Sequence, residues 1–286
     1  MTRLNHIVRF LASNWKLTAG LTILLALILF GALGPVLISE EQLQLGAGGF
    51  TKPPTADHPL GTDTSGRDML ALMVYGTPVT LKIGLIAGLV ATLAGVFLGI
   101  ASGYLGGWFD ELVRSAADVM MTIPAIAVLV VISSFTRDMS IELMGSIIAL
   151  FAWPYTTRAI RAQTLSMREH GFVRMAKISG QSDLEVILKE LMPNLLPYIA
   201  AGFVSAVSSG VLASVTLQLL GLGPLSKPSV ALVLNLAFNY AALLRELWWM
   251  WMPPTVILII LFIGLFLTSM GMDEIANPRL KGARAK

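Results

Sequence analysis

Long apolar stretches alternate with short polar ones along most of the chain. Six of the apolar stretches are long enough to cross a bilayer core of about 30 Å, which takes about 20 helical residues. They are residues 17–38, 80–103, 119–136, 141–157, 197–220 and 253–271. The third and fourth are short and close together, so we expect them to form a tight hairpin. The pattern predicts an all-α, polytopic transmembrane helical bundle of about six spans.

The distribution of Lys and Arg predicts how these spans are oriented. Six spans place both termini on the same side of the membrane. If that side is the cytoplasm, the inner segments 1–16, 104–118, 158–196 and 272–286 contain fourteen of the twenty Lys and Arg residues. Inner loops of membrane proteins carry such an excess of positive charge. We therefore expect both termini and the long loop 158–196 to lie in the cytoplasm.

The composition is typical of a membrane protein and excludes several other classes of protein and of site. Hydrophobic residues make up 55% of the chain and charged residues only 13%, whereas about a quarter of a soluble protein is charged. The net charge of +3 is explained by positive inner loops, so we expect no nucleic acid partner. The chain has no cysteine, which excludes disulfides, thiolate metal sites and a cysteine nucleophile.

The predicted cytoplasmic loop 158–196 is too regular to be a simple linker. Gly171 and Gly180 can break its helical path, and Pro193 and Pro197 mark the entry to the fifth span. After the second glycine, Ser182 and Glu185 have the spacing of a capping box, in which the two side chains satisfy free amides at a helix start. The pattern predicts a short helix, a glycine turn and a second short helix before the chain enters the fifth span.

The same loop resembles a motif of permease subunits in ATP-binding-cassette importers. That motif has the pattern E-A-A-x3-G, with L-P or a similar pair about thirteen residues after the glycine. The matching residues here are Ala176, Gly180, Asp183, Ile187, Pro193 and Asn194, while Arg174 and Met175 replace the Glu and the first Ala. The resemblance implies a coupling helix that docks in a cleft of an ATPase subunit. It implies ATPase-coupling roles for Arg174, Ala176, Gly180, Asp183, Ile187 and Pro193.

Three other segments narrow the resemblance to one branch of these importers. Residues 58–84, which begin HPLGTDTSGRD, resemble the outer-loop signature of the oligopeptide, dipeptide and nickel importers. Residues 217–229 are similar to the exit of the fifth span in that branch, and NPRLKG at 277–282 resembles its C-terminal D-P-R-L-R. The order and spacing of these motifs identify the second, C-type permease of the branch.

The resemblance implies an assembly as well as a fold. Its members form half of a translocation path that works by alternating access in the plasma membrane of a prokaryote. The implied partners are a second related permease, two cytoplasmic ATPase subunits or domains, an extracytoplasmic substrate-binding protein and membrane lipid. This chain would bind no cofactor and catalyse no reaction, because the ATPase subunits bind ATP and Mg. Oligopeptides or dipeptides are the expected substrates, and oligosaccharides or nickel are the alternatives.

The residues themselves indicate that the energy for transport comes from a partner and that this chain catalyses no reaction. The chain has no G-x-x-x-x-G-K-[ST] phosphate-binding loop, since GTDTSGR at 61–67 lacks its Lys and follows Pro59. An ion-gradient transporter is the alternative from another class, but such proteins keep ionisable groups near the bilayer midplane. The interiors of the six predicted spans contain none, and Lys82 lies near a helix end. No metal site, catalytic residue or membrane-embedded enzyme motif is recognisable.

The fifth predicted span is the most polar of the six and is our candidate for the path. Ser205, Ser209 and Thr216 lie along one helical face, because they are spaced by four and seven residues. Gln218 lies near the edge of that face and needs a hydrogen-bond partner in hydrocarbon. We therefore predict that these four residues line the translocation path. Bonding of the hydroxyls to carbonyls one turn earlier remains an equal alternative.

The remaining patterns predict packing and boundaries. Glycines 84, 88, 95, 99 and 103 follow small-xxx-small spacings, which bring helices close together. Trp248, Trp249 and Trp251 fit an aromatic belt at the outer interface, and the apolar run after Ser65 predicts an interfacial helix under the outer headgroups. We divide the chain into residues 1–78, the first span with its outer loop, and 79–286, the permease core.

Overall fold

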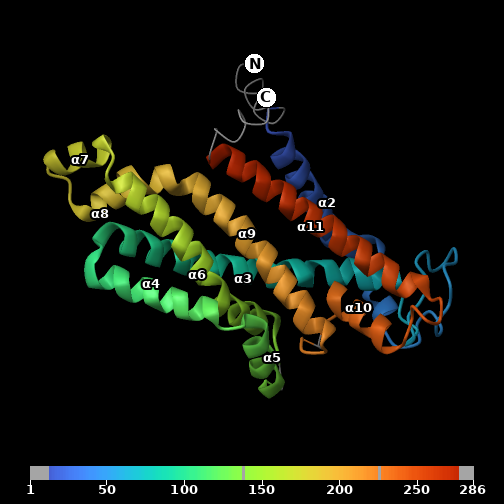
Figure 1. Ribbon diagram of the computed structural model, residues 1–286. Coiled ribbons are helices and arrows are strands. Elements are labelled where there is room, and N and C mark those ends of the chain that lie inside the picture. The colour runs from blue at the N-terminus through green and yellow to red at the C-terminus, as the bar shows by residue number, and fades with distance from the viewer. Residues whose placement is uncertain (1–12, 137–138, 225–226, 277–286) are drawn as a thin grey trace, which may run out of the picture.

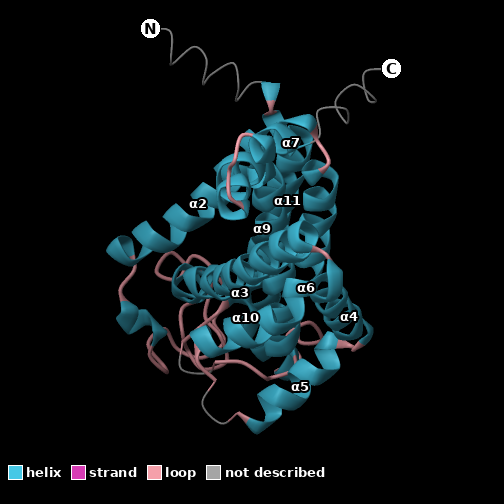
Figure 2. Cartoon of the chain, turned by 90° about the vertical axis from the view of Figure 1, so that its left-hand side faces the viewer, coloured by secondary structure: helices cyan, strands magenta, loops and turns pink. Residues whose placement is uncertain are grey.

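The computed structural model describes residues 13–136, 139–224 and 227–276, and in these ranges the regular structure is helical (Figure 2). No strand is present in the described ranges, in agreement with the predicted all-α class. The elements in chain order are α2 (Trp15–Leu37), η1 (Glu40–Leu43), α3 (Met69–Leu105), α4 (Gly107–Thr122), α5 (Ala125–Phe135), α6 (Ile141–Arg168), α7 (Gly171–Ile178), α8 (Asp183–Glu185), η2 (Val186–Leu191), α9 (Met192–Leu219), α10 (Val230–Asn239) and α11 (Trp248–Ala276).

Helix α3 is the central element, and its start corrects one prediction. The Asp68 side chain caps it by accepting the Ala71 amide at 2.8 Å. The helix then continues for 37 residues without a break. The interfacial helix predicted after Ser65 was therefore wrong, because Met69 and Met73 are fully buried in the bundle. The predicted domain boundary between residues 78 and 79 lies inside this helix.

The glycine face of α3 confirms the predicted role in packing. A Cβ atom added at Gly88 would lie 2.4 Å from the Val207 side chain of α9, and one at Gly95 would lie 2.5 Å from Thr156 of α6. Gly84 and Gly103 likewise face Val211 and Thr164. Because glycine has no side chain, α3 approaches α6 and α9 closely, at successive positions along one face.

The number of membrane spans stays a prediction. Within the described residues, four helices are long and apolar enough to cross a membrane: Trp15–Leu37, Met69–Leu105, Asp183–Leu219 and Trp248–Ala276. A fifth is counted if the pair Gly107–Thr122 and Ala125–Phe135, bent by 79°, is one span. Pro124 at the break has no amide hydrogen to continue the helix, which explains why the predicted third span is not straight.

The segment before α3 is tied to the bundle by buried polar residues. Asp63 accepts the amides of Ser65 and Arg67 and also pairs with the Arg67 guanidinium. The indole of Trp249 donates a 3.1 Å bond to the Thr62 carbonyl. Trp249 is therefore buried against this segment, which contradicts its assignment to an exposed aromatic belt. GTDTSGR forms a folded turn here and not a phosphate-binding loop.

The two ends of the bundle are distinct. Helices α2 and α11 pack side by side, and α7 and α8 form one end of the molecule, while α10 and the segment before α3 lie at the other (Figure 1). Lys16 of α2 forms an ion pair with Glu274 of α11 near the described ends of the chain. Helix α6 is 28 residues long and lies between the two ends, where it forms a wall of the candidate site.

Candidate functional site

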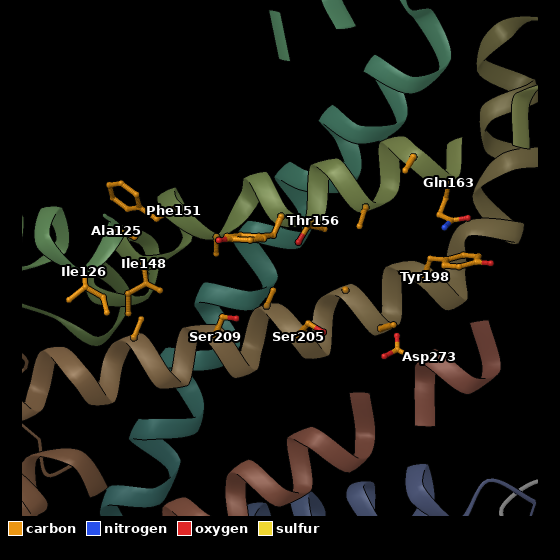
Figure 3. A pocket seen from close by; sticks show the side chains of 18 of the residues that line it. Ala125, Ile126, Ile148, Phe151, Thr156, Gln163, Tyr198, Ser205, Ser209 and Asp273 are labelled. Carbon is orange, nitrogen blue, oxygen red and sulfur yellow. The ribbon is translucent and has the colours of Figure 1, made fainter. Parts of the chain in front are cut away.

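A cavity of about 590 Å³ lies between α6 and α9, with α5 and the end of α11 at its edges (Figure 3). Small and apolar side chains make up most of its wall. The lining residues with polar side chains are Tyr155, Thr156, Gln163, Tyr198, Ser205, Ser209 and Asp273. Its size is within the range of pockets that hold small molecules.

The hollow follows from the sequence of the two facing helices. On α9, Ala201, Gly202, Ala206 and Ala213 line the cavity, and α6 contributes further alanines. Because these side chains are short, they leave open space between parts of the two helices. The glycine face of α3 meanwhile packs closely against both α6 and α9. The short side chains on α6 and α9 thus account for the cavity.

Two of the four predicted path residues lie on this wall. Ser205 and Ser209 of α9 are both exposed and line the cavity. The Ser205 hydroxyl also lies 3.2 Å from the hydroxyl of Ser269 on α11, on the side where a second hollow is lined by Ser205 and Ser208. The predicted spacing of four residues therefore brings the two serines to one side of the helix.

The other two predicted path residues lie elsewhere. The Thr216 hydroxyl donates to the Leu212 carbonyl at 2.9 Å, which is the alternative that the sequence left open. Gln218 is only 1% exposed and accepts a hydrogen bond from the Ser229 hydroxyl at the start of α10. Neither residue lines the cavity, so the face predicted from spacing ends before Thr216.

The segment that resembles a coupling motif forms a helix, a turn and a second helix start. Helix α7 is followed by Gly180, whose φ of +83° is in the left-handed region that favours glycine. The predicted capping box is confirmed: Ser182 and Glu185 each bond to the other's backbone amide. Ala176 is buried on the inner side of α7, while Ile187 is packed against the same cluster of buried residues.

The second helix does not end before the membrane span, which corrects the predicted break. Residues from Asp183 to Leu219 form one 37-residue helix. Its early part, Val186–Leu191, is π-helical. Pro193 lacks an amide and would clash with the carbonyl four residues earlier in a regular helix. The wider π turns lie just before it, inside an otherwise α-helical segment.

Asp183 connects the start of this helix to the end of α3. The Tyr104 hydroxyl donates a 2.7 Å hydrogen bond to the Asp183 carboxylate. The Lys177 ammonium of α7 lies 3.5 Å from the same carboxylate and 4.9 Å from the centre of the Tyr104 ring. These three side chains therefore join α3, α7 and α8 at a single point.

Arg174 takes part in a local ion pair on the outer side of α7. Its guanidinium lies 3.1 Å from the Glu169 carboxylate, and both side chains are about two-thirds exposed. The hydrogen bond from Arg174 lowers the pKa of Glu169. An exposed pair of this kind contributes little to stability. Glu169 thus supplies an acidic group beside the position where the resembling motif has its Glu.

An apolar surface is exposed around this turn. It consists of Phe172, Met175, Ile178, Leu184 and Leu188, which we call the α7–α8 surface. Ile178 and Leu184 are 80% and 65% exposed. Because these helices project at the end of the bundle (Figure 1), the surface has no cover from the rest of the described chain. Exposed apolar patches of this kind mark sites of interaction with other proteins or with the membrane.

Three residues that contribute to the cavity or to the α7–α8 region were not identified from the sequence. Tyr104 and Lys177 were not singled out, because no local pattern links Tyr104 to a carboxylate 79 residues away. Asp273 follows the predicted sixth span and was treated as part of a terminal segment. The one available signal in the sequence was the position of Asp273 just beyond the last apolar residue of that span. Among the described residues, no group of three His, Cys, Asp or Glu side chains could hold a metal ion.

Comparison with known families decides how the chain is classified. Residues 95–282 match the model of the binding-protein-dependent transport system inner membrane component. The chain belongs to this family. It is accordingly a multi-pass subunit of a transporter in the inner membrane, and such a subunit works together with other transport components.

Two relatives of known name match this chain over most of its length. The oligopeptide transport system permease protein OppC of Mycobacterium tuberculosis H37Rv is 27% identical over 99% of this chain and 97% of its own. The protein of the same name from Lactococcus lactis subsp. lactis IL1403 is 30% identical over 80% of this chain and 78% of its own.

A solved structure supports the fold of this family member. A chain of the MetNI methionine ABC transporter in an inward-facing conformation aligns with a TM-score of 0.58. The alignment covers 73% of this chain and 97% of that one, at 19% identity. At this level of identity the likeness concerns the arrangement of helices alone.

Proposed function

We propose that this chain forms half of the translocation path of an ATP-driven oligopeptide importer. A second related permease supplies the other half of the path. Two cytoplasmic ATPase subunits or domains bind ATP and Mg and hydrolyse the nucleotide, and an extracytoplasmic binding protein delivers the substrate. The chain itself is a transport subunit without catalytic residues. It works by alternating access, in which the path opens to one side of the membrane at a time.

The observation that carries this proposal is the continuity of one helix. The helix Asp183–Leu219 begins at the α7–α8 surface and continues to the cavity, where it presents Ser205 and Ser209. Rigid helices and their packed contacts are carriers of coupling between distant sites, and this helix is unbroken between the two. A partner that moves the α7–α8 surface would therefore move the cavity wall directly.

The α7–α8 surface has the chemistry expected of an ATPase docking site. Apolar side chains such as Ile178 and Leu184 lie at its centre, and the charged pair of Arg174 and Glu169 lies beside them. An apolar centre with a charged rim is the usual composition of a protein interface. We propose that the coupling residues predicted from the sequence act by supporting the shape of this surface and not by contacting the ATPase. They are Ala176, Gly180, Asp183, Ile187 and Pro193.

Oligopeptides are the proposed substrate for two reasons. Relatives that match nearly the whole chain are named for oligopeptide transport. In addition, the cavity wall combines small side chains with hydroxyl groups, as at Ser205 and Ser209. Such a lining accepts side chains of different size and offers hydrogen bonds to peptide groups. Oligosaccharides would also find partners there, whereas nickel would find no cluster of metal ligands among the described residues.

The function is tested with the assembled transporter in liposomes. The chain is co-expressed with its partner permease, ATPase subunits and binding protein, and uptake of a radiolabelled oligopeptide is measured. We expect uptake that requires both enclosed ATP and the binding protein. Uptake driven by a proton or sodium gradient without ATP would instead establish a secondary transporter. Uptake of oligosaccharide or nickel in place of peptide would overturn the substrate assignment alone.

A further inference from the structure

One charged side chain lies in the wall of the cavity. Asp273, near the end of α11, is the only Asp, Glu, His, Lys or Arg among the nineteen described lining residues. Figure 3 shows its carboxylate between α9 and α11, and it lines the same cavity as Tyr198 and Ser205. The side chain is exposed, and therefore a molecule in the cavity can reach it.

The nearby basic residues are engaged with other acids. Lys16 of α2 pairs with Glu274, the residue that follows Asp273. On α6, Arg161 pairs with Asp110 and Arg158 with Asp118, both on α4. Within the described ranges no ion pair or hydrogen bond involves the Asp273 carboxylate. The cavity thus has a negative group that the fold does not neutralise from these positions.

The walls around this group strengthen its field. Seven of the nineteen lining residues are alanines, and such low-dielectric walls concentrate the field of a charge within a cleft. The polar neighbours, Gln163, Tyr198 and Ser205, are uncharged and can accept hydrogen bonds through their oxygens. A carboxylate surrounded by hydrogen-bond acceptors is the arrangement that a protonated amine requires.

We propose that Asp273 is a cation-accepting site in the path and holds a protonated amine of the transported peptide, either its amino terminus or a lysine side chain. The inference rests on the proposed function, since it names the part of the substrate that the cavity recognises. The site is open to solvent, so the attraction is weak enough for the amine to leave again, as transport requires.

Uptake by the assembled transporter tests this assignment. Three peptides of equal length are compared: one with a free amino terminus, one N-acetylated with a lysine side chain, and one N-acetylated and uncharged. For each peptide, uptake by Asp273→Asn is divided by wild-type uptake, so that the selectivity of the binding protein cancels. We expect a several-fold loss for one or both amine-bearing peptides and none for the uncharged one. The affected peptide identifies the amine that is recognised.

Two further variants separate charge in the cavity from other effects. Asp273→Glu keeps the charge and should retain wild-type ratios. Glu111→Gln removes one charge from an exposed position of α4 outside the cavity and should also behave as wild type. An equal effect of Asp273→Asn on all three peptides, including loss of every uptake, overturns the proposal. Absence of uptake in the wild type would instead be a failure of the proposed function.

A chemical measurement tests the site without transport. A cysteine is introduced at Ser205, which lines the same cavity, in a chain that has no other cysteine. Its reaction rates with a cationic and an anionic methanethiosulfonate reagent are compared in membranes. We expect the ratio of cationic to anionic rate to fall several-fold when Asp273→Asn is added. An unchanged ratio means that Asp273 attracts no cation into the cavity.

Discussion

The Tyr104 hydroxyl, at the end of α3, donates a 2.7 Å hydrogen bond to the carboxylate of Asp183, 79 residues further along the chain. Tyr104 is 8% exposed and belongs to a buried cluster with Ile160 and Leu195. Asp183 is the first residue of the helix that reaches the cavity. The bond therefore ties the start of this helix to the central helix of the bundle.

Loss of this bond should weaken coupling without unfolding the protein. Tyr104→Phe keeps the ring and its packing but removes the donor to Asp183. We expect a several-fold fall in peptide transported per ATP hydrolysed, measured on the assembled transporter in liposomes. Tyr240→Phe, at the opposite end of the bundle and exposed, is the control and should leave the ratio unchanged. A normal ratio in Tyr104→Phe would contradict a coupling role for the bond.

The close approach of α3 and α9 should make Gly88 intolerant of even one methyl group. The Cβ of Gly88→Ala would lie 2.4 Å from Val207 Cγ2 and 2.8 Å from its backbone nitrogen. Overpacking of this kind costs about 1–3 kcal/mol, and we expect a lower midpoint of thermal unfolding in detergent. In the matched variant Gly202→Ala the nearest atom lies 3.7 Å from the new Cβ, and because Ala favours a helix more than Gly does, this variant should unfold at or above the wild-type temperature.

The α7–α8 surface should lose its partner when a charge is placed at its centre. Ile178 is 80% exposed, so Ile178→Glu disturbs no internal packing. We expect the variant to reach the membrane in normal amount but to retain several-fold less ATPase subunit on purification. Ser166→Glu adds the same charge to an exposed position of α6 outside this surface and serves as the control. Equal ATPase yields from both variants would exclude this surface as the docking site.

The predicted orientation can be read from two cysteines at opposite ends of the bundle. Phe50 is 71% exposed in the segment before α3, and Ile178 is 80% exposed on α7. Thr62, although in the same outer segment, is buried and bonded to Gly49, so it is unsuitable for labelling. An impermeant thiol reagent should label Phe50→Cys in intact cells and Ile178→Cys only after permeabilisation. The reverse pattern would invert the topology.

Patterns that depend on neighbours in the chain were predicted well from the sequence. The capping box of Ser182 and Glu185 is a contact over three residues, and it forms as predicted. The glycine spacing on α3 also foretold close helix packing, because a helical face is fixed by its period. By contrast, the end of the polar face after Ser209 depends on where α6 and α10 lie, and the spacing of α9 alone could not give it.

The predicted helix boundaries were wrong where the surrounding structure outweighed local sequence signals. Pro193 and Pro197 were expected to separate two helices, yet the π-helical turns before them keep the helix continuous. Met69–Met73 resembled an interfacial helix by composition, but its burial against α10 and α11 makes it the first part of α3. Tyr104 and Asp183 lacked any signal, since only the completed fold brings them together.

The central claim is that one continuous helix transmits motion from the α7–α8 surface to the cavity. It is tested by the reaction rate of a cysteine at Ser209, on the cavity wall, with a small polar thiol reagent in the assembled transporter. A cysteine at Thr216, on the same helix but outside the cavity lining, is the control. We predict that ATP and the substrate-loaded binding protein change the rate at position 209 several-fold and leave the rate at 216 unchanged. Equal rates at position 209 in the resting and ATP-bound states would contradict the account.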